Sequence, residues 1–268
     1  MAIVVRENTD ANKFFNAAGI ARTEVNIPII IAISQLTSDL RQYGLWDKMK
    51  AIYPMVGQAG VSSSFEVNLK DPNKFRGTYN GTWTFSSAGA KPSGFSGNGI
   101  TPGSSNGYFD TKLNWNTETD INNAAFGAYW NDYPDPVNNA QYYGAYTGNI
   151  SAGAALIRGL NGTSDNYINS DYIGQIFSAG NGLHAMSRIN STQITHYLNT
   201  VVNTQTAAAL AAKPNVNFHF GGINNAGFNS YQSYNIAFAF ISEGLDSTQW
   251  SNFYRAVQRF QTTLGRQV

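Results

Sequence analysis

The segment that most constrains the fold is the last one, residues 236–268. It opens with an apolar run typical of a buried strand and continues through a tight turn. Asp246 is placed to cap a helix, and Gln249 three residues later completes a capping box. Gly265 follows where a left-handed C-cap belongs. The predicted helix carries apolar residues at helical spacing: Trp250, Phe253, Tyr254, Val257, Phe260 and Leu264.

A stripe this wide has to be buried against another element, and the large partner upstream is a set of predicted β-strands. From residue 61 to 242 the apolar pattern has a period of two, interrupted by Gly, Asn, Ser and Pro turn clusters. The strands predicted from this pattern are 64–69, 78–85, 124–130, 141–146, 153–158, 183–189, 193–199, 216–223 and 233–241. Many short strands without helical crossovers favour a sandwich or jelly roll over a parallel α/β fold.

The N-terminal part is predicted to contribute a second helix over 28–43, with Pro28 in its first turn and Gly44 at its end. Residues 1–25 are polar and weakly patterned, and we interpret them as an arm. Residues 88–107 are predicted to form a long loop, because strand-like sequence continues on both sides of it. The expected organisation is therefore the arm followed by one domain, 26–268, with a sandwich over 61–242 and a closing helix over 247–264.

Composition excludes several function classes. Lys and Arg total 17 against 16 Asp and Glu, without a basic stripe, so nucleic-acid binding is not expected. The absence of Cys excludes disulfides and thiolate metal sites. The longest apolar run, 27–33, is too short to span a bilayer, so membrane insertion is not expected. The first residues lack the features of a signal peptide, which predicts synthesis in a cytoplasm without export, as for a virion protein.

Three internal stretches and the closing segment together resemble a known family. The internal ones are 15–20 (FNAAGI), 44–57 (GLWDKMKAIYPMVG) and 65–72 (FEVNLKDP). The chain is similar in these stretches to the concanavalin A-like (LamG-type) jelly-roll family of bacteriophage and virome structural proteins. The resemblance implies the fold, a virion setting such as a tail, baseplate, fibre or head appendage, other virion proteins as partners, and assembly as a homo-oligomer.

Catalytic motifs are not found. Retaining glucanases of this fold place carboxylates two residues apart on one strand. The nearest pattern, Glu118 and Asp120, lies in a predicted turn and is interpreted as structural. The three histidines, His184, His196 and His219, are scattered and are interpreted as ordinary sheet or surface residues. The sequence therefore predicts a protein that is not an enzyme.

Two Asp/Asn-rich segments are candidate Ca²⁺ loops, because Ca²⁺ takes six to eight oxygen ligands from carboxylates and carbonyls. One contains Asp132 and Asp135, and the other contains Asp165 and Asp171. The alternative is that these side chains only stabilise Asx-turns, and this interpretation is favoured. No cofactor is otherwise predicted.

An aromatic cluster between residues 130 and 146 is the candidate glycan site. Aromatic rings can stack on sugar C–H groups while neighbouring amides pair with hydroxyls, which would suit a host surface polysaccharide. The alternative is packing in the core or at a subunit interface, where Tyr and Trp are also enriched, and this interpretation is favoured. The residues are Trp130, Tyr133, Tyr142, Tyr143 and Tyr146.

Two functions follow from the sequence. The first is a non-enzymatic phage virion protein with a lectin-like fold that contacts host glycans. The second is a glycan-binding adhesin whose main role is carbohydrate recognition.

Overall fold

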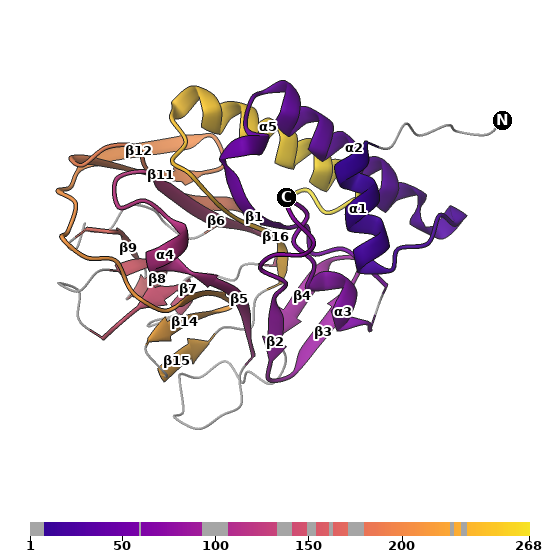
Figure 1. Ribbon diagram of the computed structural model, residues 1–268, viewed down its shortest axis with the longest axis horizontal. Helices are drawn as coiled ribbons and strands as arrows, with labels where there is room; N and C mark the ends of the chain where they lie inside the picture. The colour runs from indigo at the N-terminus through magenta and orange to yellow at the C-terminus, as the bar shows by residue number, and fades with distance from the viewer. Residues whose placement is uncertain are drawn as a thin grey trace.

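Two eight-stranded sheets stack face to face in the computed structural model, and three helices cover the outer side of one of them (Figure 1). The structure describes residues 8–58, 60–92, 107–132, 141–148, 154–160, 163–170, 180–225, 228–231 and 235–268. We call the helix-covered sheet sheet A and the other sheet B. The fold is a mainly β sandwich with helices from both ends of the sequence, as predicted.

Sheet A contains the most apolar strands of the sequence. In β6, β10 and β16 every residue is buried, because helices cover one face of the sheet and sheet B covers the other. All pairings in sheet A are antiparallel. Strand β1 pairs with β16 in addition to the linear strand order given next. The order is β12 (Val201–Thr206), β11 (Gln193–Leu198), β10 (Gly182–Arg188), β6 (Ala124–Trp130), β16 (Ile236–Ser242), β4 (Gly89–Pro92) and β3 (Trp83–Ser86), with β1 at Met49–Tyr53.

Sheet B is antiparallel except for the parallel pair β7–β14. The side chains of Phe109, Phe218 and Phe220 point from it into the core between the sheets. The order is β15 (Phe228–Tyr231), β14 (Gly222–Asn225), β7 (Gln141–Tyr146), β13 (Asn217–Phe220), β5 (Tyr108–Asn114) and β2 (Thr78–Asn80), with β8 (Ala154–Leu160) on β7 and β9 (Thr163–Ile168) on β8.

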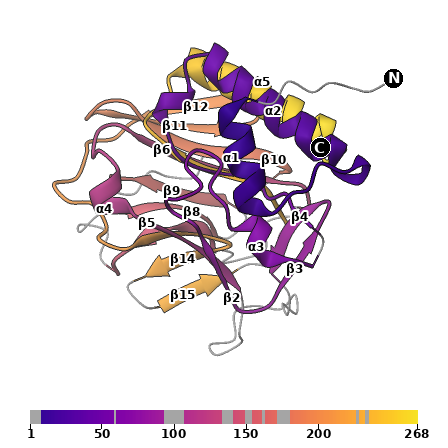
Figure 2. The same ribbon diagram turned by 45° about the vertical axis from the view of Figure 1, so that its right-hand side comes forward.

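The helical layer is built from both ends of the sequence. It consists of α1 (Thr9–Ala18), α2 (Ile27–Gln42) and α5 (Ser247–Thr263), which lie together on sheet A (Figure 2). The Phe253 ring of α5 packs 4.4 Å from Phe240 of β16, measured between ring centroids. Arg259 of α5 donates to the Asp39 carboxylate of α2 at 3.0 Å, which joins the two helices. The shorter helical turns are η1 (Glu24–Asn26), η2 (Trp46–Lys48), α3 (Ser62–Phe65) and α4 (Trp115–Glu118).

The closing helix is confirmed in detail. The Asp246 carboxylate accepts from the backbone N–H of Gln249 at 2.8 Å, and Gln249 Oε1 accepts from the backbone N–H of Asp246 at 3.1 Å. Gly265 has φ 68°, the left-handed conformation expected after the helix. Beyond it, the buried Arg266 guanidinium donates to the carbonyls of Pro54 and Ala237, which fixes the tail to sheet A.

Several local predictions differ from the structure. Predicted strands 78–85 and 216–223 each divide into two, because Gly81 (φ 78°) and Gly221 (φ 73°) turn the chain there. Segment 64–69 does not form the predicted strand, and Asn68 instead accepts from the backbone N–H of Ile52 through its side chain.

The predicted polar arm also differs where the structure describes it. Residues 8–25 contain α1, whose Phe14 and Phe15 are fully buried in the layer between the helices and sheet A. Asn8 caps this helix by accepting from the backbone N–H of Ala11 at 2.9 Å. The predicted loop 88–107 contributes β4 to sheet A through its first residues. Within the described ranges, the helices lack the combination of length and apolarity that crossing a membrane requires.

Candidate functional site

A polar network lies on the face of sheet B that points away from sheet A. In β5 and β13 the core residues Phe109, Phe218 and Phe220 alternate with polar residues, and alternate residues of a strand point to opposite faces. The register pairs His219 of β13 directly with Asp110 of β5. We call the group of polar side chains gathered here the Asp110 network: Tyr108, Asp110, Lys112, Asn217, His219 and Asn224.

Asp110 is the centre of this network. Its Oδ2 accepts from Lys112 Nζ at 2.7 Å and from Asn217 Nδ2 at 3.4 Å, and its Oδ1 accepts from the backbone N–H of Lys112 at 2.9 Å. The carboxylate is buried, whereas the Lys112 side chain is about half exposed. A buried carboxylate needs such partners to keep its charge, so these bonds hold Asp110 in place.

A bulge in β5 brings Lys112 to this position. The register shifts between the pairs Asn217–Asn114 and His219–Asp110, and Lys112 within the bulge has φ 59°. Such a backbone conformation is strained for a residue other than glycine and is found where a side chain has to be redirected. Here it allows both the backbone N–H and the ammonium of one lysine to reach the same carboxylate.

Two rings and an amide complete the network. The rings of Tyr108 and His219 stack with centroids 4.4 Å apart and planes 15° apart. His219 Nε2 lies 3.3 Å from Asn224 Nδ2 and 3.8 Å from Asp110 Oδ1. His219 is buried and Tyr108 is half-buried, so the tyrosine and Lys112 form the accessible rim over a buried polar base.

The number of carboxylates in the network bears on glycoside hydrolysis. Glycoside hydrolysis by the usual mechanisms needs two carboxylates flanking the scissile bond. Among the side chains that the structure describes, the hydrogen bonds of the network involve one carboxylate, that of Asp110. The same part of the chain contains no cluster of three or more His, Cys, Asp or Glu residues able to hold a metal ion.

The predicted aromatic platform is only partly described. Trp130 and Tyr143 are 1% and 0% exposed, and their rings lie 5.7 Å apart in the core between the sheets. The Tyr143 hydroxyl donates to the carbonyl of His184 at 3.1 Å. These two residues therefore have the packing role that was the alternative to sugar binding.

Of the other three, Tyr146 packs half-buried against a small apolar cluster on the outer face of sheet B. Tyr133 and the side chain of Tyr142 lie outside the described residues. The structure therefore does not bring the five aromatic residues together as one described surface.

The candidate Ca²⁺ ligands are described only at Asp132. Its carboxylate forms an ion pair with Lys91 and accepts from the backbone N–H of Asn235, so it links the start of β16 to β4. Asp135, Asp171 and the side chain of Asp165 lie outside the described residues. Calcium binding at these loops stays a prediction.

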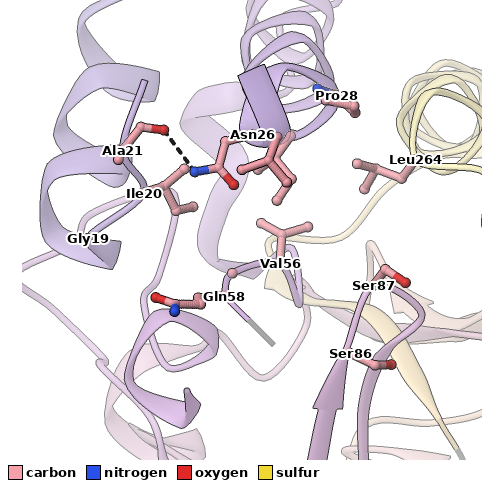
Figure 3. A pocket seen from close by; sticks show the side chains of 13 residues that line it. Gly19, Ile20, Ala21, Asn26, Pro28, Val56, Gln58, Ser86, Ser87 and Leu264 are labelled. Atoms are coloured by element: carbon pink, nitrogen blue, oxygen red, sulfur yellow. Dashed lines mark hydrogen bonds between the residues drawn. The ribbon is translucent and has the colours of Figure 1, made fainter. Parts of the chain in front are cut away.

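A separate hollow of about 560 Å³ lies on the other side of the molecule, between the α1–α2 connection, the β3–β4 turn and the end of α5 (Figure 3). Ile20, Val56 and Leu264 form apolar walls. Asn26 points toward the α1 side, where its amide donates to the carbonyl of Ala21 at 2.8 Å. The Asn26 amide is already hydrogen-bonded within the protein. The walls of the hollow are therefore mainly apolar, with few polar groups that could orient a sugar.

The Asp110 network was not predicted from the sequence, although a signal for it exists. The segments Tyr-Phe-Asp at 108–110 and Asn-Phe-His-Phe at 217–220 alternate polar and aromatic residues. Such alternation predicts a strand with one buried and one polar face. What the sequence does not indicate is that the two polar faces are neighbours, since 107 residues separate Asp110 from Asn217.

Comparison with known proteins identifies the fold. No protein-family model and no curated protein matches the sequence. Among solved structures, the chain is similar to one of botulinum neurotoxin type C, whose cell entry is described as dependent on interaction with two ganglioside molecules. The TM-score is 0.51 and the identity 12%, and the match covers 81% of this chain and 53% of that one. It is also similar to the binding domain of botulinum neurotoxin DC in complex with rat synaptotagmin II (TM-score 0.51, 11% identity, 80% and 52%). The chain thus spans about half the length of these neighbours, and the likeness shows a lectin-like β-sandwich.

Proposed function

We propose that the protein is a non-enzymatic glycan-binding module and that the Asp110 network is its sugar-contacting surface. The observation that carries this proposal is the stacked pair of Tyr108 and His219 beside a carboxylate, two amides and an ammonium group. Sugar hydroxyls can donate to a carboxylate and accept from amide or ammonium donors, while the C–H face of the ring packs on an aromatic side chain. The network brings these groups together from β5, β13 and β14.

The fold supports a recognition role without naming the ligand. One structural neighbour is described as interacting with gangliosides and another is bound to a protein, synaptotagmin II. Because the chain matches about half of each neighbour, neither ligand is transferred to it. The choice of a glycan rests on the chemistry of the Asp110 network, and host surface polysaccharide is the expected class.

The test is binding of the purified protein to a glycan array and to host surface polysaccharide, followed by titration with the best ligand. Replacing Tyr108 with Ala should weaken binding by about tenfold or more, because about 1.4 kcal/mol of lost contact is a factor of ten. Asn224→Ala should also weaken it, through the loss of a donor beside His219. Tyr254→Ala on α5 is the matched control and should bind like the wild type.

Two outcomes would argue against the proposal. One is that the wild-type protein binds no glycan. The other is that Tyr108→Ala binds as well as Tyr254→Ala while both variants remain folded at the assay temperature. Repeating the titration with Ca²⁺ and then with EDTA tests the Asp132 and Asp165 loops separately, because only a metal-dependent site loses affinity in EDTA.

We also propose that the module works in a phage virion, where it would be a structural component of a tail, baseplate, fibre or head appendage. The support is the resemblance of residues 15–20, 44–57, 65–72 and the closing segment to phage structural proteins. Mass spectrometry of purified particles tests this, and absence of the protein from the particles would contradict it. The two proposals are independent, since a virion component need not bind sugar.

A further inference from the structure

Strand β12 forms an edge of sheet A in the part of the chain that the structure describes, and its own residues lack the usual protective features. It pairs with β11 and with no other strand among the described residues, and it lies at the margin of the sheet in Figure 1. Edge strands are normally shortened, charged, interrupted by proline or covered, because their free backbone groups can pair with another strand. β12 is six residues long, Val-Val-Asn-Thr-Gln-Thr, and has no charge and no proline.

The sequence on both sides of β12 is also uncharged, and the strand exposes apolar side chains. The sequence contains no Asp, Glu, Lys or Arg from residue 189 to residue 212. Val201 and Val202 of the strand itself are 52% and 46% exposed. They are two of the six exposed large apolar side chains in the described chain, so this edge exposes apolar surface.

The register of β12 identifies which backbone groups are free to pair. The last pair in the register of β11 and β12 is Thr206 opposite Gln193. In the next pair, Ala207 N–H donates to the carbonyl of Thr192 at 2.8 Å, so that pair is hydrogen-bonded. Hydrogen-bonded and non-bonded pairs alternate along an antiparallel ladder. The backbone N–H and C=O groups of Val202, Thr204 and Thr206 therefore point away from β11.

We propose that β12 pairs antiparallel with β12 of a second copy of this chain, with the two-fold axis at Thr204. Thr204 then faces its own counterpart, and Val202 of each copy faces Thr206 of the other. The three outward-pointing residues of each strand would form about six backbone hydrogen bonds. The two sheets A would continue into one another across the interface.

A second copy is the favoured partner because the strand is complementary to itself. Threonine opposite threonine is a favourable cross-strand pair, and no like charges meet anywhere along the uncharged strand. Asn203 of one copy comes beside Gln205 of the other on the opposite face, where their amides can pair. A two-fold interface of this kind is closed and produces a dimer rather than a filament.

The absence of cysteine makes a direct test possible. In a Thr204→Cys variant the two new thiols would be the only ones in the dimer. Facing residues of a bonded antiparallel pair have Cα atoms about 5.5 Å apart, within the range that a disulfide spans. Mild oxidation should therefore convert this variant into a covalent dimer.

Thr195→Cys is the matched control. Thr195 faces Thr204 from the next strand inward, and the two hydroxyls lie 3.0 Å apart within one copy. Across the proposed axis two Thr195 residues would be separated by three strand spacings, about 14 Å, which is beyond disulfide reach. This variant should stay monomeric in a non-reducing gel under the same oxidation.

A second pair of variants tests the interface without cross-linking. Thr204→Lys places two ammonium groups at the axis and should weaken dimerisation at least tenfold in sedimentation equilibrium. Thr204→Val keeps a β-branched, uncharged side chain and should dimerise like the wild type. A monomeric wild-type protein, or equal cross-linking of the two cysteine variants, would overturn the proposal. Glycan binding has no part in these measurements, so they do not depend on the Asp110 network.

Discussion

The two sheets of the sandwich are covered in different ways. Sheet A lies between sheet B and the helices, and every residue of its central strands β6, β10 and β16 is buried. Sheet B has one apolar face against sheet A and an outer face that carries the Asp110 network. The same layer-packing rule accounts for both, since a strand face covered by another layer is mostly apolar and an uncovered face can be polar.

This difference separates stability from recognition in the molecule. The helical side contains the largest described apolar cluster, which joins α1, α2 and α5 to sheet A. The outer face of sheet B has an apolar cluster of only four buried residues, Ala154, Leu156, Tyr167 and Ile223. Changes on the helical side should therefore affect folding most, and changes in the Asp110 network should affect binding most.

The largest effect is expected from a matched pair of leucine truncations. Leu36 of α2 is fully buried in the helical layer, and Leu156 of β8 is buried in the small outer cluster. Leu36→Ala should lower the free energy of unfolding by about 4 kcal/mol and Leu156→Ala by about 2 kcal/mol, because a smaller cluster collapses more easily around a cavity. Urea denaturation measures both values. Equal losses would show that the two sides are packed alike.

The second-largest effect is expected at low pH, where the contact between sheets A and B should be destabilised. Burial lowers the pKa of His184 to about 4 and that of His196 well below its usual value. His196 Nδ1 lies 3.1 Å from Asn166 Nδ2 of β9, so this histidine connects sheet A to sheet B. Both imidazoles are therefore neutral in the folded protein at pH 7.

The sign of the pH dependence follows from these shifts. The unfolded chain binds protons at His184 from about pH 6.5 downward, whereas the folded protein does so only near pH 4. Stability from this residue is complete above pH 6.5 and is lost as the pH falls toward 4, by on the order of 3 kcal/mol. His184→Gln retains a hydrogen-bond donor and should flatten the dependence of melting temperature on pH in this window. An unchanged slope in that variant would assign the acid sensitivity to other groups.

The smallest effect is expected at the capping box of α5. Asp246→Ala removes the acceptor for the Gln249 N–H and should lower the free energy of unfolding by about 1 kcal/mol. Ser247→Ala, one residue later and exposed, is the control and should change stability by less than about 0.5 kcal/mol. Thermal denaturation followed by circular dichroism distinguishes them. A control as damaging as the cap variant would show that the loss comes from the turn before the helix.

The features predicted correctly from the sequence are those with a strong local signal. The capping box and apolar stripe of α5 define that helix, and the apolar runs of β6 and β16 define strands that any sandwich would bury. β12 was missed because the turn before it contains Asn199 at φ 54° and no glycine. Asparagine tolerates this conformation, but the residue alone is a weak turn signal.

The candidate site was missed for a different reason. Asp110 and Lys112 are charged residues within β5, and charged residues near the bulge at φ 59° argue locally against a strand. Each becomes favourable only when the other is present and when β13 brings His219 and Asn217 alongside. For Trp130 and Tyr143 the sequence left a glycan platform and core packing open and favoured packing, and their strands direct both side chains into the core.

The origin of the helical layer has a consequence for the order of events during synthesis. α1 and α2 are made first and α5 last, yet Asp39 and Arg259, 220 residues apart in sequence, meet in this layer. The faces of α1 and α2 that pack on sheet A and α5 are therefore expected to stay exposed while the strands are being made. The helical layer over sheet A cannot be completed before residues 247–263 have been synthesised. Contacts of such long sequence separation slow folding, so closure of the helical layer is expected to be the last and slowest step.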